Sequence, residues 1–271
     1  MTCVSKRVSI VVLGLCVTLG AAAQKTSYLQ TTFLKVAPDK EAEFMETMRS
    51  NTPKLAHEVF ATPINVVSVT ISRVVYAGLP AAEYNYVQSV AFDGSPMELP
   101  PATIDEVSRK ATGMSIQDYQ KKLRSMSTIV GSTLGRREAT TPVTQRKEGE
   151  YAQVTYYKIT PGRAADYANF IQRMVLPTQA QLVKDGTNAG WAAYRVVSPS
   201  GTEAMFDAAA ATYYHDMASV VPSMPVSPDQ LQIAFAKALP GQSFATAADL
   251  NRDTRRAART ELRRVVAVAY K

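Results

Sequence analysis

Cysteine is nearly absent from this sequence. The 271 residues include only Cys3 and Cys16, and both lie in an N-terminal segment with the pattern of a signal peptide. Without that segment the chain has no thiol, which excludes a disulfide framework, a thiolate nucleophile and a cysteine-ligated metal. A chain of this size can bury enough apolar surface to fold without disulfides.

Long hydrophobic runs are also scarce. The apolar run Ile10–Leu19 follows Lys6 and Arg7 and precedes the small residues Ala21–Ala23. This order is typical of a secretory signal peptide, and the run is shorter than the roughly 20 residues that span a bilayer. We predict that residues 1–23 are cleaved and that the mature protein is periplasmic or secreted, without stable membrane insertion. An uncleaved membrane anchor is the alternative.

The sequence has only two histidines, His57 and His215. It contains no His-x-x-His or Glu-x-x-His spacing, no Ser-His-acid arrangement and no glycine-rich phosphate loop. We therefore predict no metal site and no cofactor, and assign no catalytic residue. Haem or metal ligation by one histidine is the weakest alternative.

Acidic residues are fewer than basic ones. Removing Lys6 and Arg7 from the 30 basic residues leaves 28, against 23 acidic residues, and the sequence pI is about 9.3. An exported protein rarely meets nucleic acid, so we predict no nucleic-acid partner. Most of this charge is expected on a solvated surface, with attraction to anionic ligands or lipid head groups as the alternative.

One pattern occurs twice. The stretch YLQTTFLKVAPDKEAEF (Tyr28–Phe44) corresponds to YAQVTYYKITPGRAADY (Tyr151–Tyr167), 123 positions later. Further on, SRVVYAG (Ser72–Gly78) corresponds to YRVVSPS (Tyr194–Ser200) at almost the same offset. A period this long is too long for a solenoid and indicates a duplicated domain.

Each copy predicts the order β-α-β-β-α-β. The β-branched and aromatic run of Tyr151–Ile159 predicts a strand, and the apolar spacing that follows predicts a helix, which Pro177 and its counterpart Pro53 are expected to interrupt. The expected fold class is α+β: two tandem ferredoxin-like (βαββαβ) repeats, 24–146 and 147–271, whose open sheets pair into an intramolecular barrel.

Arginines are concentrated near the C-terminus. Their near-helical spacing favours a solvated helix face, although RTELRRVVAVAY by itself is ambiguous between helix and strand. The arginines concerned are Arg252, Arg255, Arg256, Arg259 and Arg263. The single tryptophan, Trp191, begins a predicted strand and is expected to anchor packing.

Three stretches carry a family resemblance: VTYYKITPGRAADYANF, GWAAYRVVSPSGTEAMFD and LPGQSFATAADLNRDTRRAARTELRRVV. They resemble NIPSNAP-like exported bacterial proteins of the dimeric α+β-barrel superfamily, which includes antibiotic-biosynthesis-type monooxygenases. The resemblance implies two ferredoxin-like units packed into a barrel. It implies no activity, because members range from cofactor-free oxygenases and haem-handling enzymes to proteins without a known role.

Alternation along the strands suggests candidate ligand-binding residues. Side chains two positions apart share a face, so the Tyr/Gln/Thr rows of the two first strands are expected to face the barrel interior. Arginines on the second strands join them, although their direction stays open. The candidates are Tyr28, Gln30, Arg73, Tyr151, Gln153, Tyr157 and Arg195. A barrel interior packed solid is the alternative.

The sequence leaves the function open between two classes. The first is an exported protein that binds a small apolar or aromatic ligand in its barrel. The alternative is a cofactor-independent oxygenase that acts on an aromatic substrate, because such chemistry requires little beyond positioning in a desolvated pocket. The oligomeric state stays open.

Overall fold

The computed structural model describes residues 27–77, 83–142, 145–199, 204–221 and 226–271. The predicted signal peptide lies outside these residues. The first half contains β1 (Ser27–Val36), η1 (Pro38–Lys40), α1 (Glu41–Phe60), β2 (Val66–Ala77), β3 (Tyr86–Asp93), α2 (Pro101–Thr112), α3 (Ile116–Met126) and β4 (Ser127–Thr140). The second contains β5 (Tyr151–Ile159), α4 (Ala164–Phe170), η2 (Ile171–Val175), α5 (Leu176–Lys184), β6 (Gly190–Ser198), β7 (Ala208–Tyr214), α6 (Met217–Val220), α7 (Pro228–Ala238), α8 (Phe244–Thr254) and β8 (Arg255–Tyr270).

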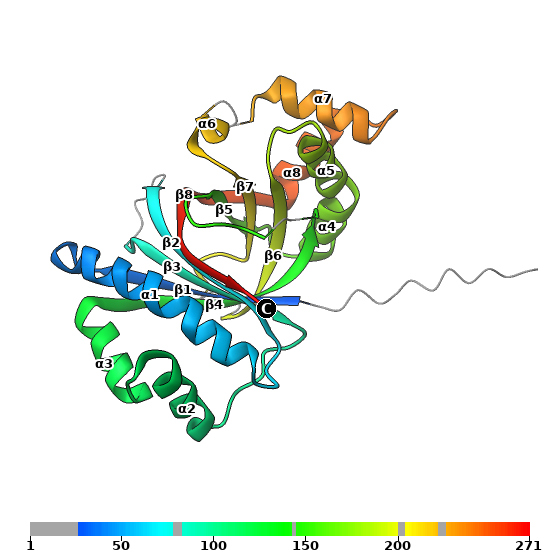
Figure 1. The fold of residues 1–271 in the computed structure, drawn as a ribbon. Helices are drawn as coiled ribbons and strands as arrows, with labels where there is room; N and C mark the ends of the chain where they lie inside the picture. The colour runs from blue at the N-terminus through cyan, green and yellow to red at the C-terminus, as the bar shows by residue number, and fades with distance from the viewer. Residues whose placement is uncertain (1–26, 78–82, 143–144, 200–203, 222–225) are drawn as a thin grey trace, which may run out of the picture.

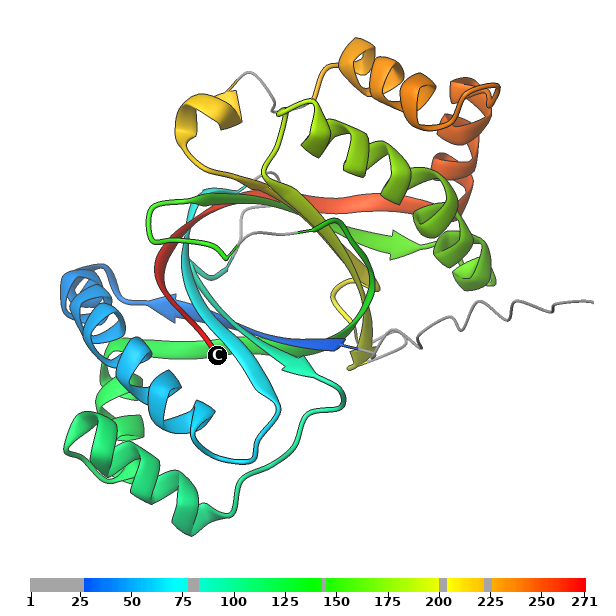
Figure 2. The same ribbon diagram turned by 45° about the vertical axis from the view of Figure 1, so that its right-hand side comes forward.

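The strands form one closed antiparallel barrel in the order β1-β3-β2-β8-β5-β7-β6-β4 (Figures 1 and 2). Within this order each half keeps the ferredoxin-like arrangement, with its fourth strand beside its first. The halves meet edge to edge, β2 against β8 and β6 against β4. The predicted α+β class and the paired ferredoxin-like units are therefore confirmed.

Two long strands close the barrel. β4 has 14 residues and β8 has 16, against 9 in β5. The N-terminal part of β8 pairs with β5, and its C-terminal part pairs with β2, so one strand crosses between the halves. Register shifts interrupt both pairings, and such bulges bend a strand around a barrel corner. The segment that we predicted as a solvated helix face is thus largely strand: of its five arginines, only Arg252 lies in a helix.

Helices cover the outside of the barrel (Figure 2). In the first half Phe44 of α1 packs on Tyr86 of β3 with ring centroids 4.9 Å apart. In the second half Tyr167 and Ile171 pack with Trp191, which is 2% exposed. Trp191 is therefore a packing anchor, as predicted.

The two helix prolines have different effects. Pro53 lies inside α1, which continues to Phe60, so the predicted interruption is wrong there. Pro177 follows a five-residue π-helical turn, Ile171–Val175, that joins α4 to α5. A wide turn of this kind relieves the clash between the proline ring and the preceding carbonyl groups.

Among the described residues, no helix is long and apolar enough to cross a membrane.

Candidate functional site

The barrel interior is lined by the faces opposite to those that we predicted. The cavity wall includes Leu29 and Thr31 from β1, and Ala152, Val154 and Tyr156 from β5. The predicted Tyr/Gln/Thr rows alternate with these residues and point outward. The parity of the rows was right, but the face was wrong, because the alternation along a strand does not specify which face a closed barrel turns inward.

The candidates on the two first strands lie outside the cavity in different surroundings. Tyr28 packs against the cluster around Ile64 and Phe92, and Gln30 lines a separate cleft between α1 and the outer sheet face. In the second half, Tyr157 lies beneath the guanidinium of Arg255, 4.0 Å from its ring centroid.

The remaining first-strand candidates pack near α6. Tyr151 contacts the cluster that contains Tyr214 and Val220. Gln153 accepts a hydrogen bond from the Tyr214 hydroxyl at 3.4 Å. The structure therefore does not gather the predicted residues into one site; whether any of them binds a ligand elsewhere stays a prediction.

The two candidate arginines are paired on the outer face. Arg73 Nε lies 2.7 Å from the Glu41 carboxylate in the same half. Arg195 Nε lies 2.9 Å from Glu138, which belongs to β4 of the other half. Arg73 thus pairs within its own half, whereas Arg195 pairs across the halves, because the β4–β6 pairing brings Glu138 beside it.

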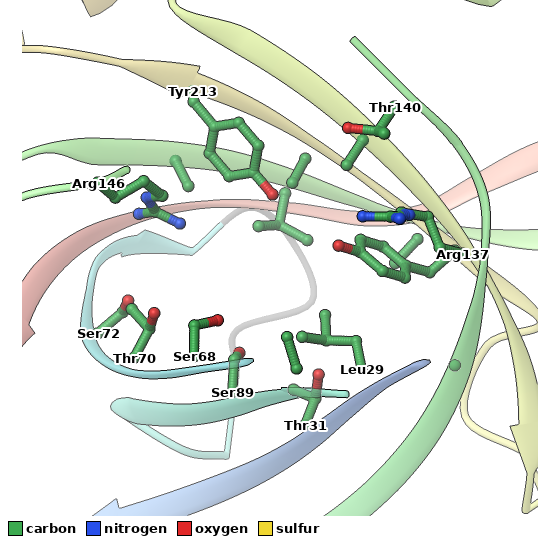
Figure 3. Close-up of a pocket in the computed structure, with 18 of the residues that line it drawn as sticks. Leu29, Thr31, Ser68, Thr70, Ser72, Ser89, Arg137, Thr140, Arg146 and Tyr213 are labelled. Carbon is green, nitrogen blue, oxygen red and sulfur yellow. The ribbon is translucent and has the colours of Figure 1, made fainter. Parts of the chain in front are cut away.

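A cavity of about 420 Å³ occupies the barrel interior (Figure 3). Strands of the first half contribute hydroxyl groups to its wall, namely Thr31, Ser68, Thr70, Ser72, Ser89, Thr133 and Thr140. Strands of the second half contribute small apolar side chains, namely Ala152, Val154, Ala192, Val196, Ala209 and Ala211. The second half also contributes Tyr156, Tyr194, Phe206 and Tyr213, so its wall combines small apolar side chains with aromatic rings.

Three arginines and Lys271 line this cavity, and no Asp or Glu side chain does so among its described lining residues. Arg137 and Arg146 lie on opposite sides of it, with Tyr213 between them (Figure 3). Arg137 Nη2 donates to the Ser27 hydroxyl at 2.7 Å. The Arg146 guanidinium lies 4.7 Å from the centre of the Tyr213 ring, and its Nε and Nη2 atoms are buried without a hydrogen-bond partner.

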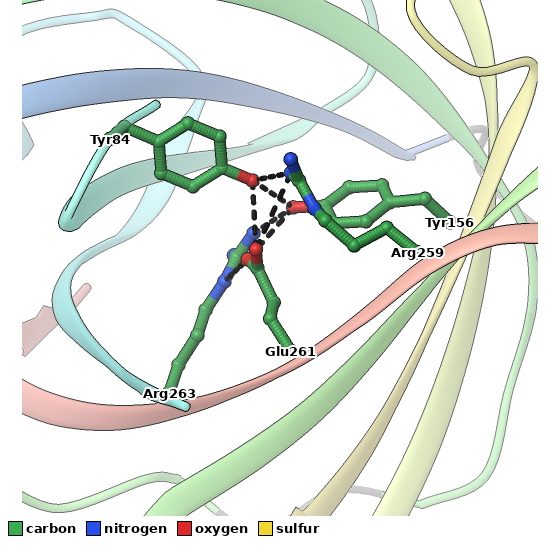
Figure 4. Close-up of polar contacts among 5 residues, drawn as sticks. All are labelled: Tyr84, Tyr156, Arg259, Glu261 and Arg263. Atoms are coloured by element: carbon green, nitrogen blue, oxygen red, sulfur yellow. Dashed lines mark hydrogen bonds and ion pairs between the residues drawn. The ribbon is translucent and has the colours of Figure 1, made fainter. Parts of the chain in front are cut away.

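The third arginine, Arg263, belongs to a buried network around Glu261 (Figure 4). Glu261 has no exposed surface and accepts hydrogen bonds from Tyr84 at 2.8 Å and from Tyr156 at 3.1 Å. Arg263 Nε donates to the same carboxylate at 2.5 Å, and Arg259 Nη2 lies 3.4 Å from it. Two guanidinium groups thus share one carboxylate, which leaves a net positive charge inside the barrel.

Burial determines the protonation of this network. Removal from water raises the pKa of the Tyr156 phenol well above its usual value, so the phenol stays protonated and donates. Burial opposes the charge on Arg263, but Glu261 together with Tyr156 and Tyr213 outweighs burial and raises the pKa of the guanidinium. Burial also raises the pKa of Tyr194 on the cavity wall. The arginines around the cavity therefore only donate hydrogen bonds, whereas the hydroxyl groups of its tyrosines, serines and threonines can donate and accept.

The two histidines lie elsewhere. His57 is exposed on α1, and His215 is exposed with its Nδ1 atom 3.1 Å from Glu150 Oε1. Neither is among the residues that line the cavity. Within the described ranges, no group of three or more His, Cys, Asp or Glu side chains could hold a metal ion.

The sequence carried a signal for the network that we missed. Arg259, Glu261 and Arg263 alternate at a spacing of two, which places them on one face of a strand. The wider arginine cluster Arg252–Arg263 masked this alternation. Tyr84 and Tyr156 gave no local signal, because their role depends on a contact between the two halves.

Comparisons with known proteins place the chain by its fold. No protein-family model and no curated protein matches it. A solved structure of a putative monooxygenase from Fusobacterium nucleatum has 11% identity and a TM-score of 0.55, over 91% of this chain and 95% of that chain. An anthrone oxidase-like protein has 12% identity and a TM-score of 0.53, over 92% and 94%. The chain thus has the fold of the dimeric α+β barrel proteins.

Proposed function

We propose that this protein binds a small organic molecule inside its barrel. The observation that carries the proposal is the interior cavity of about 420 Å³, which falls in the range of known ligand sites, about 300–1,000 Å³. Its small apolar wall suits the face of a flat, unsaturated or aromatic ring. Its hydroxyl wall suits polar groups at the edge of that ring.

Native mass spectrometry of the protein purified from its own host tests this proposal. A bound small molecule of aromatic character, released on denaturation, is the expected result. A protein that carries nothing and that binds no aromatic probe in calorimetric titration would contradict it.

A second candidate function is cofactor-independent oxygenation of an aromatic substrate. It is favoured by the similarity in fold to proteins described as a putative monooxygenase and as anthrone oxidase-like. The cavity adds support, because its guanidinium and phenol donors would stabilise the phenolate that such a substrate presents to oxygen.

This chemistry restricts the substrate. The described residues on the cavity wall include no histidine and no Asp or Glu side chain as a general base. A substrate would therefore enter as an already ionised phenol or enol. Oxygen consumption with anthrone is the test: a rate above the protein-free rate supports the candidate, and no excess rate at any pH between 6 and 9 contradicts it.

We also propose, as the NIPSNAP-like resemblance implies, that the protein is exported. The support is the charged, apolar and small residue order of residues 1–23. Edman sequencing of the protein from the periplasm or medium should begin near Gln24. An intact Met1 on a membrane-bound protein would contradict export.

A further inference from the structure

We infer that the barrel ligand is an organic anion, and that its carboxylate binds Arg146, while Arg137 and Arg263 add positive charge to the cavity wall. This inference rests on the proposed ligand-binding function and adds the chemical class of the ligand. It follows from the charge balance of the barrel interior, which differs from that of the outer surface.

On the outer face, both second-strand arginines meet carboxylates. Arg73 pairs with Glu41 and Arg195 with Glu138, at 2.7 and 2.9 Å. Inside, Glu261 is the one carboxylate that the described residues place beside the guanidinium groups of Arg259 and Arg263. One carboxylate cannot neutralise both, so the network keeps an excess positive charge where burial makes an unpaired charge costly.

The other two cavity arginines add to this excess. Arg137 bonds a neutral hydroxyl group, that of Ser27. Arg146 stacks on Tyr213, and two of its guanidinium nitrogens are buried without an acceptor. Buried polar nitrogens are normally hydrogen-bonded, so Arg146 calls for an acceptor that the described residues do not supply. A ligand carboxylate supplies oxygen acceptors and a compensating charge together.

Glu261 acts on this site as a positioning residue. Its carboxylate fixes Arg263 at 2.5 Å and is itself held by the hydroxyl groups of Tyr84 and Tyr156. Arg263 therefore reaches the cavity wall in one orientation, with little side-chain freedom left to lose when an anion binds. The interior offers an anion a rigid set of donors together with an apolar surface for the rest of the molecule.

The test compares two probes of equal shape in calorimetric titration at pH 7. Naphthalene-2-carboxylate carries the charge, and naphthalene-2-carboxamide is its neutral counterpart. A charge-assisted hydrogen bond favours the carboxylate, so we expect it to bind about 10- to 100-fold more tightly. Arg146→Met should remove most of that preference and leave the affinity for the amide unchanged, whereas Arg137→Met, on the opposite side of the cavity, should remove less of it.

Arg73→Met is the matched control, because this arginine lies on the outer face. It should leave both affinities unchanged. The comparison in the unsubstituted protein is informative even where one variant fails to fold. Equal affinity for both probes would overturn the anion inference and leave the proposed function intact. Binding of neither probe would count against both.

Discussion

The hydroxyl group of Tyr84 donates to the Glu261 carboxylate at 2.8 Å, although the two residues are 177 positions apart. Tyr84 precedes β3 of the first half, and Glu261 lies on β8 of the second. The hydrogen bond therefore joins the halves inside the barrel. With Tyr156, Arg259 and Arg263 it forms the polar centre of the interior (Figure 4).

Glu261→Gln should destabilise the protein by about 3–5 kcal/mol, because it leaves two buried guanidinium groups without an anion. Tyr84→Phe should cost about 1–3 kcal/mol, because it removes one hydrogen bond to a charged group. Urea unfolding of the purified protein measures both. Glu148→Gln is the control, since its exposed pair with Arg49 should contribute less than about 1 kcal/mol. Equal effects of Glu261→Gln and Glu148→Gln would refute the role of the network.

Arg73→Met and Arg195→Met test what the two arginines on the outer face contribute to stability. Arg73 is half exposed, so its loss should cost less than about 1 kcal/mol. Arg195→Met should cost more, about 1–3 kcal/mol, because Glu138 is only 10% exposed and keeps a single partner, Arg136. Thermal melts measure the difference. Neither substitution should change ligand affinity, and a loss of affinity in either would show that the outer arginines bind the ligand.

Either half expressed alone, 24–146 or 147–271, should not stay monomeric. Separation frees the edge strands that pair β2 with β8 and β4 with β6, and it opens the interior face to water. Self-association into a two-chain barrel, or aggregation, is the expected result in size-exclusion chromatography with light scattering. A monomeric half with a sharp melting transition would contradict this account of the barrel.

Stability should fall steeply between pH 10 and pH 12. Burial raises the pKa of Tyr167 to about 12, against 10 for a tyrosine in the unfolded chain. Below pH 10 the folded and unfolded states both keep the phenol proton, so this group contributes no pH dependence to the free energy of unfolding. Above pH 10 the unfolded state loses the proton first, which lowers stability by about 1.4 kcal/mol per pH unit for each such tyrosine.

Denaturant unfolding at a series of alkaline pH values measures this slope. Tyr167→Phe is the matched variant, because it keeps the ring and removes the ionisable group. Its free energy of unfolding should fall less steeply with pH than that of the unsubstituted protein, by about 1.4 kcal/mol per pH unit between pH 10 and pH 12. An identical slope would show that Tyr167 does not titrate as its burial requires.

The internal repeat made the fold predictable. The offset between Tyr28–Phe44 and Tyr151–Tyr167 identified two equivalent units, and a ferredoxin-like unit leaves one sheet face open. Pairing of two such units followed. The edge-to-edge closure through β4 and β8 did not follow, because RTELRRVVAVAY, which forms much of β8, was ambiguous between helix and strand.

The site was less predictable. Alternation separates two faces of a strand, but no local signal states which face a closed barrel turns inward. Leu29 and Thr31 rather than Tyr28 and Gln30 therefore line the cavity. The network around Glu261 was hidden for another reason, since Tyr84 and Glu261 become neighbours only when the two halves close.

The central claim is that the cavity holds the ligand, and the affinity of naphthalene-2-carboxylate for Ala211→Phe tests it most directly. Ala211 lies on the cavity wall, so a phenyl group there should occupy the space that the naphthalene ring needs. The control is Val197→Phe on β6, where Val197 is 38% exposed and is not among the cavity residues. We predict that Ala211→Phe keeps its cooperative melt and loses at least about tenfold in affinity, whereas Val197→Phe binds as the unsubstituted protein does. Undiminished binding by a folded Ala211→Phe would contradict the claim.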